Sequence, residues 1–202
     1  VKNIDKPRNI DGLDRAMLTT DPYEIVNNPE STVIAELIGG VHPAYELIKK
    51  AIENGKHVVT ANKELLAKHG EELFNYAEQH NVVILYEAAI AGGIPLIMPI
   101  KTILAGNKIT KIEAILNGTT NYILTNMDVN QSSYETVLKE AQELGYAEAD
   151  PTGDVEGFDS TYKLTTLATI TFNKRVKLEN VYREGITKIR SQDMHAANDL
   201  GY

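Results

Sequence analysis

Cysteine is absent from this 202-residue sequence, which excludes disulfides, thiolate metal sites and a cysteine nucleophile. No apolar run reaches the roughly 18 residues of a membrane-spanning helix, and the N-terminus has no signal-peptide pattern. The 20 basic side chains are outnumbered by 28 acidic ones, and no basic cluster dominates one segment. This balance disfavours nucleic acid as a partner. We expect a soluble cytoplasmic protein that binds neither nucleic acid nor membrane.

Several catalytic signatures are also missing. There is no GxSxG, so acyl transfer is not indicated, and the five histidines form no HExxH zinc pattern. GxGxxG is absent as well, although a dinucleotide-binding fold normally carries it after its first strand. Either the chain binds no dinucleotide, or its first βαβ unit lies outside the sequence. The irregular first 20 residues favour the second interpretation.

Residues 33–86 alternate between short apolar strands and amphipathic helices. This order predicts βαβ units and a doubly wound parallel sheet, with the third strand apolar on both faces. A short helix is also expected after Asp21-Pro22, and Gly70 is expected to break the helix that follows Lys63. The predicted strands are 33–38, 57–60 and 82–86, and the predicted helices are 43–54, 63–69 and 71–80.

The pattern changes after residue 87 and predicts an α+β region. Helices are expected at 96–106, from 119 or 120, at 134–144, after 158 and from 191. Alternating residues predict strands at 111–116 and about 182–189. The fold class is therefore α/β, with a partial parallel sheet in residues 1–86 and an α+β domain in residues 87–202.

An acidic loop at 144–158 leads into an apolar helix that carries Asp159 and Lys163. Such a loop could simply be solvated. However, Asp159 and Lys163 are four residues apart and therefore share a helix face. A lysine paired with an aspartate at the start of an apolar helix suits acid/base chemistry. Of the other loop carboxylates, Asp150, Asp154 and Glu156 are assigned to loop structure or to a long-range field.

Three further loops have both a structural and a functional interpretation. Gly39-Gly40 and Lys63 follow predicted strands, where open α/β sheets hold ligands; the structural alternatives are a tight turn and a surface lysine. The small residues of 87–95 could direct backbone carbonyls at a cation, or could form a packing turn. The polar run 117–121 could be a helix cap or an anion or amino-acid clamp.

With these motifs assembled, the chain closely resembles the homoserine dehydrogenase family. The resemblance implies reversible reduction of aspartate 4-semialdehyde to homoserine with NADPH or NADH, in threonine, methionine and isoleucine biosynthesis. It implies a Rossmann-type cofactor domain, represented by residues 1–86, and a catalytic and dimerisation domain, 87–202, incomplete at its C-terminus. A homodimer or dimer of dimers is implied as well. The matching strings are ELIGG (36–40), VVTANKELLA (58–67), YEAAIAGGIP (86–95), ILNGTTNYILT (115–125) and LGYAEADPTGDVEGFDSTYKL (144–164).

The resemblance also implies roles for individual residues. Lys163 corresponds to the acid/base lysine and Asp159 to its partner. The residues implied in substrate binding are Glu148, Asp159 and Lys63. Those implied in binding NADP or NAD are Ile38, Gly39, Gly40, Lys63 and Gly145. A monovalent cation, sodium or potassium, would be held by main-chain oxygens of Glu87, Ile90, Gly92 and Ile94.

The missing GxGxxG unit is the main departure from the family pattern, so the chain resembles an internal piece of such an enzyme. We expect this piece alone to bind NADPH weakly and to turn over slowly, if at all. The alternative is a truncated or inactive homologue that only dimerises and binds an amino acid. The intact Lys63, Glu148, Asp159 and Lys163 weigh against inactivation by decay. A sugar dehydrogenase of similar architecture would not account for the acidic, amine-suited loop.

Overall fold

The computed structural model describes residues 1–201 and divides into two compact units, Val1–Ala89 and a second that begins at Ile90. Each unit is described by itself. The assignment of the first to a cofactor and the second to catalysis and dimerisation stays a prediction. Within the described residues, no helix combines the length and apolar character needed to cross a bilayer.

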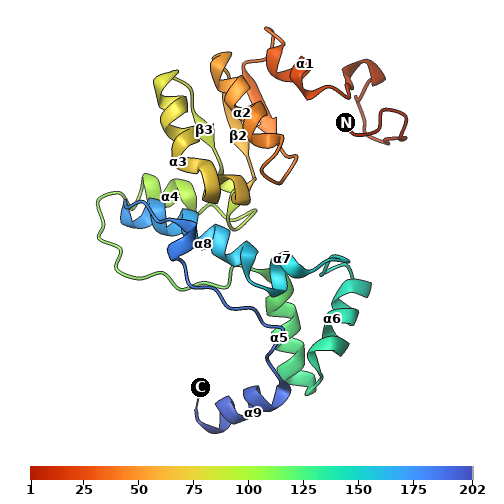
Figure 1. Cartoon of the computed structure of the whole chain (residues 1–202), viewed down its shortest axis with the longest axis vertical. Helices are drawn as coiled ribbons and strands as arrows, with labels where there is room; N and C mark the ends of the chain where they lie inside the picture. The colour runs from red at the N-terminus through yellow and green to blue at the C-terminus, as the bar shows by residue number, and fades with distance from the viewer. Residues whose placement is uncertain (202) are drawn as a thin grey trace. The chain divides into compact units, whose positions relative to one another are not determined.

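The first unit is built on a parallel sheet of β1 (Val33–Glu36), β2 (His57–Thr60) and β3 (Ile84–Leu85), in that order (Figure 1). In the register, Ile34 lies opposite Val58, and Val58 lies opposite Ile84. Because the strands are parallel, their carboxyl ends meet at one edge of the sheet, where open α/β folds bind ligands. The predicted α/β class with a small parallel sheet is confirmed.

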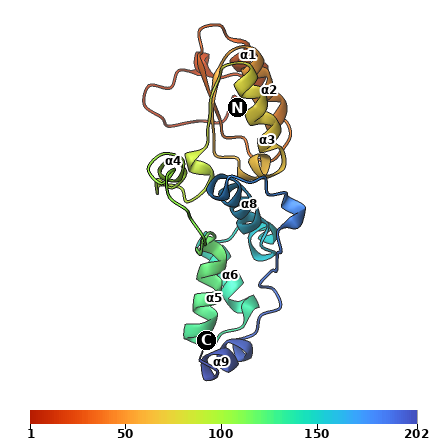
Figure 2. The ribbon, with the colours of Figure 1, turned by 90° about the vertical axis from the view of Figure 1, so that its left-hand side faces the viewer.

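Helices α2 (Ala44–Glu53) and α3 (Lys63–Gln79) pack side by side against one face of this sheet (Figures 1 and 2). Both are crossover helices. Because the chain moves across the sheet in one direction, from β1 to β2 to β3, right-handed crossovers place both helices on the same side. Ile34, Val58 and Ile84 are buried on this face. On the other face, Val33 and Leu85 are 51% and 49% exposed, so burial of the third strand on both faces was a wrong prediction.

The predicted break at Gly70 is also wrong, because α3 runs through it without interruption. A glycine inside a helix costs only about 1 kcal/mol relative to alanine, and burial of Leu65, Leu66 and Leu73 outweighs that cost. A Cβ at position 70 would lie 3.3 Å from the Phe74 ring. The glycine therefore permits close packing rather than ending the helix.

Four short helices lie outside this sheet and its two covering helices. The first unit also contains η1 (Arg15–Met17), α1 (Pro22–Asn27) and η2 (Glu87–Ala89). Asp21 caps α1 by accepting a hydrogen bond from the Tyr23 amide, as an aspartate before proline predicts. The second unit contains α4 (Ile97–Lys101), which stops well short of the predicted end near residue 106.

The second unit is otherwise formed by α5 (Gly118–Asn130), α6 (Tyr134–Glu143), α7 (Thr152–Val155), α8 (Phe158–Phe172), η3 (Leu178–Asn180) and α9 (Ser191–Asp199). Helices α5 and α6 lie side by side (Figures 1 and 2). Their shared core consists of Ile123, Met127, Val137 and Ala141, and Val155 of α7 completes it. This core fixes the start of α5 against the acidic loop.

The strands predicted at 111–116 and 182–189 do not form. A strand needs a neighbour for its backbone N–H and C=O groups, and within residues 1–201 the structure pairs neither segment in a ladder. The second segment instead packs on the joint between α7 and α8, where the Ile186 amide donates to the Val155 carbonyl at 2.8 Å. A Cβ on Gly185 would lie 2.8 Å from that same oxygen.

Candidate active site

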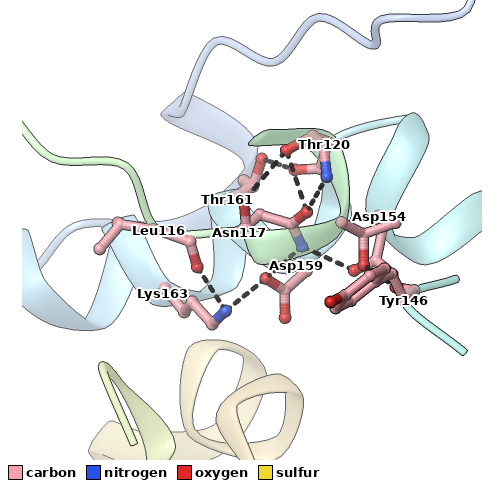
Figure 3. A network of polar contacts seen from close by, with 10 residues as sticks. Leu116, Asn117, Thr120, Tyr146, Asp154, Asp159, Thr161 and Lys163 are labelled. Carbon is pink, nitrogen blue, oxygen red and sulfur yellow. Dashed lines mark hydrogen bonds and ion pairs between the residues drawn. The ribbon is translucent and has the colours of Figure 1, made fainter. Parts of the chain in front are cut away.

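Asp159 and Lys163 form an ion pair in the first two turns of α8 (Figure 3). Lys163 Nζ lies 2.5 Å from Asp159 Oδ2, and it also donates to the carbonyl oxygen of Leu116 at 2.6 Å. The side chains are only 15% and 8% exposed, so solvent screens the pair weakly. The helical spacing therefore brings these two residues together as expected. Their catalytic roles stay predictions.

Asn117 joins this pair to a second carboxylate (Figure 3). Its side-chain amide donates to Asp159 Oδ2 at 2.9 Å and to Asp154 Oδ1 at 2.6 Å. Its side-chain oxygen accepts from the Thr120 amide at 2.8 Å and so caps α5. The cap interpretation of 117–121 accounts for the oxygen, but the sequence carried no signal for the two donors, because Asp154 and Asp159 lie 37 and 42 residues away.

Asp154 therefore belongs to this hydrogen-bonded cluster, whereas the sequence analysis had assigned it only to loop structure or to a long-range field. The other loop carboxylates make local contacts. Asp150 Oδ1 accepts from the Thr152 hydroxyl at 2.6 Å, and this hydrogen bond, with that from the Thr152 amide, lowers the pKa of Asp150. Glu156 accepts from Thr187 at 3.1 Å. Both keep a structural role in the loop that precedes α8.

Glu148 and Gly145 lie in the loop between α6 and α7. The Glu148 side chain is exposed, and its backbone carbonyl accepts from Gln142 Nε2 at 3.0 Å. Gly145 has a φ of +81°, just after the end of α6, and the following amide of Tyr146 returns to the Ala141 carbonyl at 2.8 Å. This is the geometry of a helix-terminating glycine. A role for either residue toward substrate or cofactor stays a prediction.

In the first unit, the loops after β1 and β2 are linked by hydrogen bonds. The buried Glu36 carboxylate accepts from the Ile38 amide at 2.7 Å and from the Thr60 hydroxyl at 2.7 Å. Asn62 donates to the Gly40 carbonyl at 2.6 Å and caps α3, whose first residue is Lys63. Sequence reasoning had not assigned a role to Glu36, since a carboxylate in an apolar strand has no motif of its own.

The backbone after β1 is open at the two glycines that the resemblance assigns to cofactor binding, and that assignment stays a prediction. Gly39 and Gly40 have φ values of +79° and +71°, and the space where a Cβ would stand is open at both. Ile38 is 49% exposed beside them. A ligand can therefore approach the backbone closely at this edge of the sheet, as glycines in such loops permit.

The predicted cation loop begins with the short 3-10 helix η2 and continues as irregular backbone. Glu87 begins η2, Ile90 is buried, and Gly92 and Ile94 are exposed. Ala91 and Gly93 have positive φ values, of 51° and 83°. Within residues 1–201 no cluster of three His, Cys, Asp or Glu could hold a metal. A site made of main-chain oxygens, as sodium or potassium prefers, stays a prediction.

Comparison with known proteins gives consistent matches along the chain. The family model "Homoserine dehydrogenase" matches residues 95–202, and "Homoserine dehydrogenase, NAD binding domain" matches residues 2–87. A homoserine dehydrogenase from Synechocystis is 48% identical over 202 residues, 100% of this chain and 46% of that protein. One from Pseudomonas aeruginosa is 51% identical over 92% of this chain and 43% of its own length.

Solved structures that resemble this chain are also homoserine dehydrogenases. The crystal structure of a homoserine dehydrogenase from Thiobacillus denitrificans has a TM-score of 0.89 and 49% identity, and covers 91% of this chain and 43% of that one. A hyperthermophilic archaeal homoserine dehydrogenase in complex with NADPH has a TM-score of 0.77 and 31% identity, with coverages of 84% and 52%. The chain thus spans about half the length of the relatives it matches.

Proposed function

The chain belongs to the homoserine dehydrogenase family, and on this premise we propose that it carries the proton-transfer site for reversible, NAD(P)H-dependent reduction of L-aspartate 4-semialdehyde to L-homoserine. This reaction belongs to threonine, methionine and isoleucine biosynthesis. One observation supports the proposal most directly. Lys163 is held at low exposure between the Asp159 carboxylate and the Leu116 carbonyl, at 2.5 and 2.6 Å.

In the proposed reduction, the nicotinamide cofactor supplies a hydride to the aldehyde carbon. The carbonyl oxygen then becomes an alkoxide that needs a proton and a nearby positive charge. The Lys163 ammonium supplies both. Two of its three N–H groups are engaged by Asp159 and Leu116 within the described chain, which leaves one for the substrate oxygen. In the oxidation direction the neutral amine accepts the proton from the hydroxyl of homoserine.

Carboxylates of the acidic loop and of α8 suit the other end of the substrate. Both aspartate semialdehyde and homoserine carry an α-ammonium group, and we assign its binding to Glu148 with Asp159. Lys63 is proposed to contact substrate and cofactor from the start of α3. Cofactor binding is assigned to Ile38, Gly39, Gly40 and Gly145 in addition. The main-chain oxygens of Glu87, Ile90, Gly92 and Ile94 are proposed to hold sodium or potassium.

Substitution of Lys163 by alanine tests the proposal. The assay measures homoserine oxidation with NAD⁺ and NADP⁺ in the longest natural polypeptide that contains this sequence. We expect kcat to fall by about 10²- to 10⁴-fold, the range typical of a lost acid/base group. Lys139→Ala is the matched control, because Lys139 is an exposed lysine on α6 whose ion pair to Glu143 spans 3.8 Å.

The outcomes separate the two candidate functions. A fall of less than about tenfold in Lys163→Ala would refute the acid/base assignment, since such a change lies below the range for proton transfer. A parent protein that binds homoserine but never oxidises it would favour the alternative, an inactive homologue that dimerises and binds an amino acid. The homodimer or dimer of dimers is proposed from family membership and is measured by light scattering in the same preparation.

A further inference from the structure

Asn117 and the residue before it, Leu116, together contact both members of the Asp159–Lys163 pair. The side-chain amide nitrogen of Asn117 donates to Asp159 Oδ2 at 2.9 Å, the same oxygen that lies 2.5 Å from Lys163 Nζ. The preceding carbonyl, that of Leu116, accepts from Lys163 at 2.6 Å. The two-residue segment 116–117 therefore holds the carboxylate and the ammonium at once (Figure 3).

We propose that Asn117 is the positioning residue of the proton-transfer site: its side-chain amide sets Asp154 and Asp159 side by side and thereby helps to orient Lys163 between Asp159 and the Leu116 carbonyl. This inference rests on the proposed function. Asn117 acts through Asp159 and Lys163 and makes no contact with the reacting atoms itself.

The start of α5 gives Asn117 a fixed place from which to act. Its side-chain oxygen accepts from the backbone amide of Thr120 at 2.8 Å and from the Thr120 hydroxyl at 2.9 Å. The residue is only 6% exposed, so water does not compete strongly for these bonds. With the oxygen held by α5, the planar amide group points its two N–H donors at the two carboxylates.

The side-chain chemistry of asparagine distinguishes a positioning role of Asn117 from a role as a helix cap alone. Ser, Asp and Asn all cap helices well, because each offers a side-chain oxygen to the first-turn amides. Only Asn combines that oxygen with two donors in one rigid plane. Asp154 and Asp159 would otherwise repel each other, and a bridging N–H₂ group offsets this repulsion. A cap alone does not require asparagine here, whereas two adjacent carboxylates do.

Two variants keep a capping oxygen and remove the N–H₂ group that bridges the two carboxylates. Asn117→Ser retains an oxygen for Thr120. Asn117→Asp retains the size as well but places a third carboxylate beside Asp154 and Asp159. Ser133→Ala is the control, because Ser133 caps α6 through a 3.3 Å bond to the Thr136 amide at an exposed position away from the pair. All are made in the longest natural polypeptide, beside the parent and Lys163→Ala.

We expect kcat for homoserine oxidation to fall about tenfold or more in Asn117→Ser and about a hundredfold in Asn117→Asp, as misplaced catalytic groups do. The KM for the cofactor should stay within about threefold of the parent value, because a positioning role affects the reacting step and not the cofactor site. Ser133→Ala should keep kcat and KM within about twofold. If Asn117 were only a helix cap, its variants and Ser133→Ala would both lower the melting temperature, and kcat would not fall selectively in the Asn117 variants.

A kcat in Asn117→Ser within about twofold of the parent overturns the inference and leaves the proposed function intact. An inactive parent refutes the proposed function instead, so the two failures are distinguishable.

Hydrogen exchange of side-chain amides in the unmodified protein decides the matter if both variants fail to fold. The Asn117 side-chain protons should exchange far more slowly than those of Asn121, an exposed asparagine on the same helix. Equal exchange rates would overturn the inference, because they would show that the two carboxylates do not hold the amide.

Discussion

Replacement of Glu36 should weaken both the fold of the first unit and the loop that follows β1. Glu36 is 4% exposed, and its carboxylate accepts from the Ile38 amide at 2.7 Å, the Gly39 amide at 3.3 Å and the Thr60 hydroxyl at 2.7 Å. The Thr60 oxygen also accepts from the Asn62 amide at 3.0 Å. The carboxylate thus connects the ends of two neighbouring strands.

The loss of unfolding free energy depends on which of these donors can form hydrogen bonds with water instead. The Ile38 and Gly39 amides lie in an exposed loop and can recover hydrogen bonds to solvent. Thr60 is 1% exposed and cannot, so its hydroxyl would be left unsatisfied. A bond to a charged acceptor contributes about 1.5–3 kcal/mol, and a buried unsatisfied hydroxyl costs about 1–3 kcal/mol. We expect Glu36→Ala to lower the free energy of unfolding by about 3 kcal/mol.

Glu36→Gln should destabilise the protein less than Glu36→Ala. Its side-chain oxygen can keep the two loop amides, but its N–H₂ group faces the Thr60 oxygen, so the Thr60 hydroxyl hydrogen loses its acceptor. The expected loss is about 1–2 kcal/mol. Urea denaturation measures both variants, with the exposed Glu30→Ala as a control that should change the free energy by less than about 0.5 kcal/mol. A Glu36→Ala protein as stable as that control would refute the reasoning.

Two other predictions concern packing and ionisation. Gly185→Ala should lower the free energy of unfolding by about 2 kcal/mol, because its Cβ would lie 2.8 Å from the Val155 carbonyl, whereas Gly153→Ala, with open space around it, should change it little. Burial raises the pKa of the Tyr86 phenol, so its contribution to stability is present below pH about 10 and is lost as the pH rises through the raised value. Tyr86→Phe should therefore flatten the alkaline loss of stability measured by urea denaturation between pH 8 and 11, and the exposed Tyr23→Phe should not.

Local patterns in the sequence predicted what local physics determines. The strand at His57–Thr60 follows from apolar spacing, and the helix from Tyr134 follows from apolar spacing and its Ser133 cap. The first strand begins at Val33 as predicted but ends at Glu36, two residues before the predicted end. The strands predicted at 111–116 and 182–189 failed for the opposite reason. Alternation shows that a segment could pair, but a ladder needs a partner, and no local pattern supplies one.

The candidate site divides in the same way. The spacing of Asp159 and Lys163 predicted their contact, since residues four apart on a helix are neighbours. The contributions of Leu116 and Asn117 could not be predicted, because those residues reach the pair from 42 to 47 positions earlier in the chain. Their placement depends on how α5 packs against α6 and α7, which is a property of the core and not of any motif.

The helical spacing of Asp159 and Lys163 alone would not restrict the lysine to one orientation. An exposed pair at this spacing contributes only about 0.3–0.5 kcal/mol, whereas ordering a lysine side chain opposes it with about 2 kcal/mol of rotamer entropy. Low exposure and the second acceptor, the Leu116 carbonyl, are what restrict Lys163 to one orientation.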